Sequence, residues 1–343
     1  MTVNVALVTS EALVLGCDSI ASVTGLYLDP INFIDRDAEG ILKVDEGGKW
    51  TARFAFADLA TVVTDAWGGV TKMFRLCADP NPVAAVTSGL AAVNEQKISG
   101  IAKSFSETKG SDGQFTTVSA VVNAFVEHIG DEYEKAHQSV EEMFRGDLDF
   151  LIGGFGRQDA FPSVYRVNLK RPKDKRISPL YGPGQGFSGR TGLAWAGQAD
   201  AVERLLFGVD SLLRQAVDRS IREYTETLHK AMSQSVVNIL AATLRKLNAT
   251  LPTDVDTTLP AQPTFQANWD EGRLFIDFAN LPLQDAVDFV SYLVSIQSGK
   301  AKFVRGVPQV GGRTHIGIVQ RGSFSMPNEP ELSHRNIGYA RDL

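Results

Sequence analysis

The chain has 343 residues, of which 43% are hydrophobic and 22% are charged, a balance typical of a soluble globular protein that buries a substantial core. Its formal net charge is -6 and its basic residues are scattered, which argues against nucleic acid as a partner. The start of the chain has no basic leader and the longest apolar runs are too short to span a bilayer, so we expect a cytoplasmic protein without a membrane partner.

The first expected elements are strands. Residues 2–17 alternate apolar with small or polar positions around a central polar break, a pattern that predicts a hairpin. Glycines punctuate residues 20–70, which indicates short strands and loops there. Two further strands are predicted in the segments TKMFRLC (71–77) and VAAVTSG (83–89), joined by a turn at 79–82.

Helices and strands then follow one another. Apolar residues at steps of three and four predict helices over about 90–106 and 117–143, and the segments FLIGGFG and SVYRVNLK return to strand character. The same spacing from 199 to 247 predicts a long helix or a helix pair, which a proline-rich loop ends. DAVDFVSYLVSI predicts another helix and HIGIVQRG a last strand. This order indicates helices that cover sheets on both sides.

Neither the cysteines nor the histidines suggest a metal or cofactor site. Two cysteines in a chain of this length form no disulfide framework and no ligand cluster, so we interpret Cys17 and Cys77 as reduced core thiols. The five histidines show no HExxH or other ligand spacing. We therefore expect no metal and no cofactor.

The first residues of the chain carry a candidate reaction centre. A threonine hydroxyl is a weak nucleophile at neutral pH and needs an adjacent base, and a free α-amine on the same residue, with a reference pKa of about 7.7–8.0, can be that base. Thr2 supplies both groups once Met1 is removed, which its small side chain permits. A lysine held by an acid would lower the pKa of the amine and hydroxyl, and a glycine N–H would stabilise the oxyanion.

These residues resemble the start of the mature chain in proteasome β subunits and their bacterial relatives, including the Anbu-type proteins. Thr2 opens the first strand, and Asp18, with Ser19, closes the second strand sixteen positions later, which is the spacing of that family. Lys72 before a later strand and Gly89 before a helix follow the order of the family. FLIGGFG with PSVYRV looks like its central hairpin, and VGGRTHIGIV looks like its final Gly-Gly strand.

The resemblance implies an α+β fold, namely the four-layer αββα sandwich of Ntn hydrolases with helical and loop insertions. It implies a single proteasome-like domain over residues 1–343, with insertions at about 23–69 and 210–280 and a polar C-terminal tail over 326–343. Relatives of this kind assemble into rings or open spirals, so a homo-oligomer is also implied. The sequence does not identify an unfoldase partner.

The resemblance also implies roles for individual residues. The four catalytic positions are those of the nucleophile, the acid, the lysine and the oxyanion-binding glycine, which here are Thr2, Asp18, Lys72 and Gly89. The substrate-binding positions are Ser22, Ala21, Phe74 and Ala91. The serine is expected on a strand whose backbone pairs with an extended substrate, and the other three residues are expected to help line the side-chain pocket.

Some positions depart from the pattern of the family. A serine in a Gly-Ser-Gly turn, and an Asp and a Ser before the final Gly-Gly pair, usually order the amine and the catalytic water. Here Gly197, Val307 and Val310 occupy those places. The altered polar shell weakens the case for ordinary peptidase activity, because misplaced supporting groups slow catalysis. In addition, Lys43 in GILKVD is a rival to Lys72 for the role of the lysine.

Together these features favour an N-terminal threonine hydrolase that cleaves an amide bond, first of all a peptide bond, by way of an acyl-enzyme on Thr2. Two alternatives stay open. One is a catalytically silent proteasome-like subunit for assembly or binding, which Val307 and Val310 favour. The other is an amidase that acts on a non-peptide substrate.

Overall fold

The computed structural model describes residues 2–27, 43–45, 47–49, 60–78, 80–111, 113–182, 184–185, 189–248, 269–304 and 308–327. The chain divides into two compact units, of which the larger comprises Met1–Ala199 with Asp277–Leu343 and the smaller Asp200–Ile276. Helices and antiparallel sheets occur together, so the predicted α+β class is confirmed at that level.

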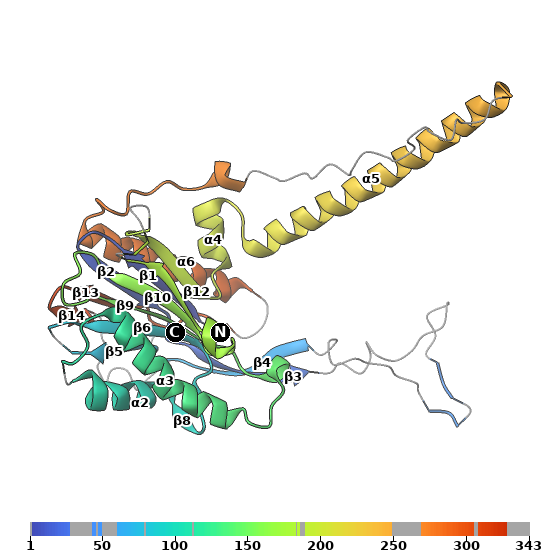
Figure 1. Ribbon diagram of the computed structural model, residues 1–343. Helices are drawn as coiled ribbons and strands as arrows, with labels where there is room; N and C mark the ends of the chain where they lie inside the picture. The colour runs from blue at the N-terminus through green and yellow to red at the C-terminus, as the bar shows by residue number, and fades with distance from the viewer. Residues whose placement is uncertain are drawn as a thin grey trace. The chain divides into compact units, whose positions relative to one another are not determined.

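Two five-stranded antiparallel sheets lie in the larger unit (Figure 1). The first has the order β12-β1-β2-β13-β14, with β1 (Val3–Val8), β2 (Ala12–Cys17), β12 (Gly192–Gly197), β13 (His315–Gln320) and β14 (Ser323–Ser325). The second has the order β11-β10-β9-β6-β5, with β5 (Met73–Cys77), β6 (Val83–Gly89), β9 (Leu148–Gly154), β10 (Ser163–Asn168) and β11 (Ile177–Tyr181). Two short pairs are β3 (Ala21–Tyr27) with β4 (Ala60–Trp67), and β7 (Ala92–Val93) with β8 (Gln96–Lys97).

The two sheets face each other through a shared apolar layer. Side chains alternate along a strand, so Ala6 and Val8 of β1 point into this layer, where they meet Ala84 and Val86 of β6. The other face of the first sheet packs against α6 (Leu283–Phe303). Gly16 on β2 permits this approach, because a Cβ there would lie 2.4 Å from a methyl group of a valine on α6.

The outer face of the second sheet is covered by α2 (Ile98–Phe105) and α3 (Val118–Ala136), as Figure 1 shows. Aromatic rings fill the space between them. Phe125 lies edge-on to Phe105 at 5.3 Å and to Phe150 of β9 at 5.4 Å between ring centroids, a geometry that aromatic pairs prefer. This packing fixes the helices over the sheet.

The smaller unit contains α4 (Asp200–Phe207), α5 (Ser211–Lys246) and a 3₁₀ turn (Trp269–Gly272). Asp210 caps α5 by accepting a hydrogen bond from the backbone N–H of Leu213 at 2.8 Å, and it also pairs with Arg204 of α4. Of the two alternatives predicted from the apolar spacing, a long helix or a helix pair, the structure has the pair. Within the described residues, no helix is both long and apolar enough to cross a membrane.

Several predicted boundaries are wrong. The helix expected from about residue 90 begins only at Ile98, because residues 92–97 form the β7–β8 hairpin with Asn94 and Glu95 at positive φ. This helix continues as a π-helical turn over Ser106–Gly110. The helix expected to reach residue 143 ends at Ala136, and a separate 3₁₀ turn follows at Glu142–Phe144. Strands β11, β12 and β14 were not predicted. A 3₁₀ turn also lies at Lys173–Lys175.

Candidate active site

A buried ion pair lies at the end of the first hairpin. Asp18, which follows β2, is 0% exposed, and Lys72, which precedes β5, is 5% exposed. The Nζ of Lys72 donates to Asp18 Oδ1 at 2.8 Å. The same carboxylate accepts backbone N–H bonds from Val3 at 3.1 Å, Ile20 at 3.2 Å and Gly311 at 3.1 Å. Four donors from four parts of the chain therefore converge on one side chain.

Burial disfavours the charged form of the Lys72 side chain. It therefore lowers the pKa of Lys72, while the negative charge and the hydrogen bond of Asp18 oppose this shift. Two charges taken out of water cost free energy that their attraction repays only with good geometry and further hydrogen bonds, which the backbone donors to Asp18 supply. A buried lysine with a perturbed pKa beside a cavity is a feature that functional sites share.

Thr2 is held from both sides. Its side chain is buried, and it directly precedes β1. The next residue, Val3, donates its backbone N–H to Asp18 and so fixes the chain on one side of Thr2. The carbonyl oxygen of Thr2 accepts a bond from the backbone N–H of Gln198 at 2.7 Å. Gly197 makes this contact possible, since it has φ +77° and a Cβ there would lie 1.9 Å from that oxygen.

A cavity of 580 Å³ opens beside these residues. Of the predicted site residues, six line it: Thr2, Lys72, Gly89, Ala21, Ser22 and Ala91. The structure thus brings the expected nucleophile, lysine and glycine to one cavity, and Asp18 to the lysine. Among the described residues that line the cavity none is acidic, whereas two are lysines, Lys72 and Lys97.

Phe74 lies elsewhere. On β5, Met73 points into the layer between the sheets, and the next residue, Phe74, points to the opposite face. There its ring is buried in the apolar cluster beneath α2 and α3, and it is not among the residues that line the cavity. Phe74 thus has the position of a core residue rather than of a pocket wall.

Gly89 ends β6 in a conformation that favours glycine. Its φ is +98°, and a Cβ there would lie 2.0 Å from the carbonyl oxygen of Asp147. The next residue, Leu90, donates its N–H to the same oxygen at 2.9 Å. The strand therefore turns sharply at the cavity, and glycine is required for the turn whatever its role in chemistry.

The remaining candidates fall into place around this centre. Lys43 is exposed, so Lys72 is the lysine of the two that Asp18 holds. Val310 is fully buried next to the glycine that binds Asp18, and Val307 lies outside the described residues. Ser19 accepts a bond from the N–H of Arg313 at 2.8 Å and thereby ties the hairpin to the segment before β13.

Sequence reasoning missed Ser88 at this site. The residue precedes Gly89, is buried, and lines the cavity. Nothing distinguishes a serine in the segment VAAVTSG from an ordinary strand residue until the facing sheet is known.

Cys17 adjoins the ion pair but is unsuited to nucleophilic chemistry. Burial raises its pKa to about 12, while the charge of Lys72 lowers it and that of Asp18 raises it. Burial likewise raises the pKa of Cys77 to about 11. Both are free and buried, so they remain protonated near neutral pH, when only a thiolate would be reactive.

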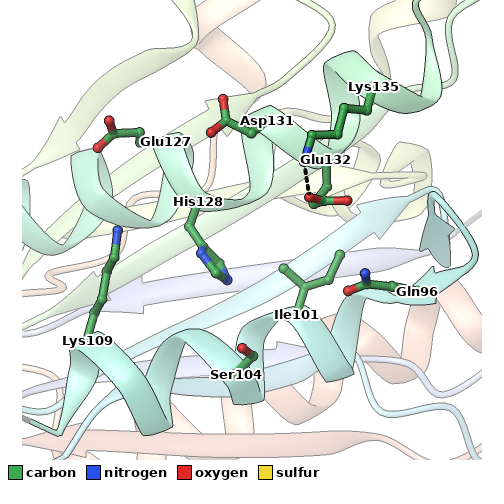
Figure 2. A pocket seen from close by; sticks show the side chains of 9 residues that line it. All are labelled: Gln96, Ile101, Ser104, Lys109, Glu127, His128, Asp131, Glu132 and Lys135. Atoms are coloured by element: carbon green, nitrogen blue, oxygen red, sulfur yellow. Dashed lines mark hydrogen bonds and ion pairs between the residues drawn. The ribbon is translucent and has the colours of Figure 1, made fainter.

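A second, smaller cavity of 290 Å³ lies between α3 and the segment formed by α2 and its π-helical turn (Figure 2). Figure 2 shows acidic residues and His128 of α3 above Lys109 and Ser104. Burial and the nearby Lys109 lower the pKa of His128. Glu132 pairs with Lys135 at 2.8 Å, as helix-surface charges commonly do. Among the residues that line this cavity, no nucleophile is joined to a base.

Neither cavity suggests a metal centre. Within the part of the chain that the structure describes, no group of three His, Cys, Asp or Glu residues is placed to hold a metal ion. The larger cavity is the stronger candidate for chemistry by side chains, because Thr2 and the lysine of the buried ion pair both line it.

No protein-family model matches the sequence, and no curated protein matches it. Solved structures that are similar over most of their length include three of Anbu proteins. The Gly-1 mutant of Anbu from Hyphomicrobium sp. strain MC1 is 10% identical and has a TM-score of 0.43, with 98% of this chain and 91% of that chain covered. Anbu, an ancestral beta-subunit, from Yersinia bercovieri is 9% identical and has a TM-score of 0.42, with 97% of this chain and 89% of that chain covered. The helical assembly of the Anbu complex from Pseudomonas aeruginosa is 10% identical and has a TM-score of 0.40, with 98% of this chain and 90% of that chain covered. With TM-scores this low, the assignment of the site rests on the geometry of this chain alone.

Proposed function

We propose that this protein is a proteasome-like N-terminal threonine hydrolase that cleaves amide bonds, in the first place peptide bonds, after removal of Met1. The observation that carries the proposal is the buried Lys72–Asp18 pair, whose lysine lines the same cavity as Thr2. A purely structural role would not require a charged pair at the wall of a cavity, because apolar residues of similar volume are often as stable.

The proposed reaction has two halves. The hydroxyl of Thr2 attacks the carbonyl carbon of the amide, and its proton passes to the α-amine. The C–N bond then breaks, the leaving amine takes that proton, and the acyl group remains on Thr2 as an ester. Water attacks the ester with the α-amine again as the base, and the acid product leaves as the Thr2 hydroxyl re-forms.

The other residues support this chemistry. The positive charge of Lys72, held by Asp18, favours the neutral amine and the ionised hydroxyl of Thr2. The N–H of Gly89 is the proposed oxyanion donor, since this residue lines the cavity without a side chain to obstruct the substrate. Ser22 and Ala21, on β3, and Ala91 are proposed to contact the substrate.

The proposal extends to the fold and assembly. The order of α6, the two facing sheets, and α2 with α3 is compatible with a four-layer αββα sandwich of the Ntn class in one enlarged domain over residues 1–343. We propose insertions at about 23–69 and 210–280 and a homo-oligomeric state. The alternative, a silent assembly subunit, is favoured by the buried Val310 at a position where a polar group is expected.

The test is the replacement of Thr2. Thr2→Ala should abolish both turnover of a peptide reporter and covalent labelling by an electrophilic peptide, while Thr2→Ser should retain part of each, because it keeps a hydroxyl beside the amine. Thr9→Ala is the matched control. Thr9 is also a buried threonine at an end of β1, but its hydroxyl binds the carbonyl of Ala12 in the turn, so labelling should persist.

Intact-mass measurement of the purified chain completes the test. A mass lacking Met1, together with a label on Thr2, is the result the proposal requires. Retention of Met1, or undiminished labelling of Thr2→Ala, contradicts it and supports the silent subunit.

A further inference from the structure

A fully buried asparagine lies two residues after Thr2. Asn4 is 0% exposed in a strand, VNVALV, in which every other residue is apolar. Within the described residues, neither its Nδ2 nor its Oδ1 has a hydrogen-bond partner. Leaving such a group unpaired in the interior is costly, so buried amides in native proteins nearly always bind protein atoms or an internal water.

The face on which Asn4 lies leads to the site. Its direct neighbours on the adjoining strands are Cys17 of β2 and Ala196 of β12, and both belong to the layer between the sheets. Thr2 directly precedes β1, and its carbonyl still accepts a bond from Gln198, which follows β12, so the alternation of the strand extends to Thr2 and places its side chain on the side of Asn4. The polar amide therefore adjoins the inner end of the proposed reaction centre.

Ser88 approaches from the opposite sheet. Ala84 and Val86 of β6 face the layer between the sheets, and Ser88 continues the same alternation. A Cβ on Gly197 would lie 1.9 Å from the Thr2 carbonyl oxygen and 3.5 Å from the Cβ of Ser88. Ser88 thus lies close to Gly197 and the Thr2 carbonyl, at the end of the layer to which the alternation along β1 assigns Asn4.

The spacing suits one bridging water. Side chains two apart on a strand have origins about 6.7 Å from each other, and two hydrogen bonds through a water span about 5.6 Å. An internal water needs two to four polar partners, and the Asn4 amide, the Ser88 hydroxyl and the polar groups of Thr2 provide them. Gly197 and Val310 offer no polar side chain for this purpose.

We propose that Asn4 is a positioning residue for Thr2, and that with Ser88 it binds an internal water that orients the hydroxyl and amine of the nucleophile. This inference rests on the proposed hydrolase function. It assigns to β1 and β6 the supporting role for which Gly197 and Val310 have no polar side chain.

A structural experiment tests the water independently of activity. A crystal structure of the full chain at a resolution that reveals ordered water should contain one within hydrogen-bond distance of the Asn4 amide and Ser88 Oγ. Absence of a water there, or an Asn4 amide bonded only to protein atoms, overturns the proposal whether or not the protein is a hydrolase.

The kinetic experiment tests positioning. Asn4→Leu, a near-isosteric change, should lower kcat about tenfold or more with KM unchanged, and should leave the melting temperature equal or higher because an apolar side chain replaces a buried polar one of similar size. Asn4→Ser should restore part of kcat. Ser88→Ala should cause a similar loss, and the double variant should lose no more than either single variant, since both act through one water. Ser163→Ala, a buried serine of β10 away from the cavity, is the control.

Each outcome is decisive. Wild-type kcat in Asn4→Leu, or losses that multiply in the double variant, overturns the positioning role. A third outcome is that the water is present but wild-type protein without Met1 neither reacts with the electrophilic peptide nor hydrolyses a reporter. That result contradicts the proposed function. Asn4 then holds only a structural water, and its positioning role is overturned as well.

Discussion

At the level of single residues, Asp18 organises the site, because its carboxylate accepts bonds from Lys72 and from three backbone N–H groups. Asp18→Asn keeps the shape but places an NH₂ group against these donors. We expect the free energy of unfolding to fall by about 3–5 kcal/mol, as when a buried charge pair loses one partner. Urea denaturation of the full chain measures this change, and labelling of Thr2 should fall in parallel.

Asp45→Asn is the matched control for this substitution. Asp45 also accepts two backbone N–H bonds, from Gly47 at 2.9 Å and Lys49 at 2.8 Å, but it is exposed and water can replace them. Its replacement should change stability far less. Equal effects of the two substitutions would indicate that the buried pair is not the origin of the loss.

At the level of elements, the contact between β12 and the residue before β1 depends on Gly197. Gly197→Ala combines an unfavourable φ of +77° with a Cβ placed 1.9 Å from the Thr2 carbonyl oxygen. Because that atom is backbone, the strands must move apart. We expect a loss of about 4 kcal/mol or more in the free energy of unfolding, together with loss of labelling at Thr2.

Gly322→Ala separates the two causes. Gly322 has nearly the same φ, +81°, but a Cβ there would meet no atom within 4 Å. Only the conformational cost of about 1–2 kcal/mol should appear, with labelling unchanged. Thermal or chemical denaturation of both variants provides the comparison, and a cost for Gly197→Ala no greater than for Gly322→Ala would disprove the steric argument.

The elements also show what periodicity can predict. The first hairpin, β5, β6, β9, β10 and α6 follow from alternation or helical spacing, because their apolar faces are continuous. The β7–β8 hairpin does not, since it depends on Asn94 and Glu95 adopting positive φ in a segment that otherwise suits a helix. β12 was not predicted, because its sequence, GLAWAG, is short and has glycine at both ends, which weakens the strand pattern.

The site shows the same division. Motif order brought Thr2, Asp18, Lys72 and Gly89 into consideration. The structure locates the threonine, the lysine and the glycine at one cavity and the aspartate against the lysine, with their roles still predicted. Asn4 and Ser88 could not be recognised, because their proximity depends on two sheets that face each other across the core. The one local signal was a lone asparagine in an apolar strand.

At the level of the whole molecule, the two compact units differ in how they bury apolar residues. The larger unit buries apolar residues between its two sheets and beneath α2 and α3, whereas none of the residues of α5 is buried. Large apolar side chains recur along α5 at steps of four: Leu228, Met232, Val236 and Leu240 are 46%, 60%, 54% and 40% exposed. A 36-residue helix spans about 54 Å, and most helices owe their stability to a packed apolar face.

We therefore expect the chain to self-associate through α5. Replacing Leu228, Met232 and Val236 together by Gln should weaken association by more than about a hundredfold, since each buried side chain of this size contributes about 1.5–3 kcal/mol. Sedimentation velocity over a range of concentrations measures the effect. The matched control replaces Arg222, Glu226 and Lys230 of the same helix by Gln and should leave association intact. A wild-type chain that is monomeric at every concentration contradicts this expectation, because the apolar face would then have no partner chain to bury it. Equal weakening by both triple variants contradicts it as well, because association would then not depend on the apolar side chains.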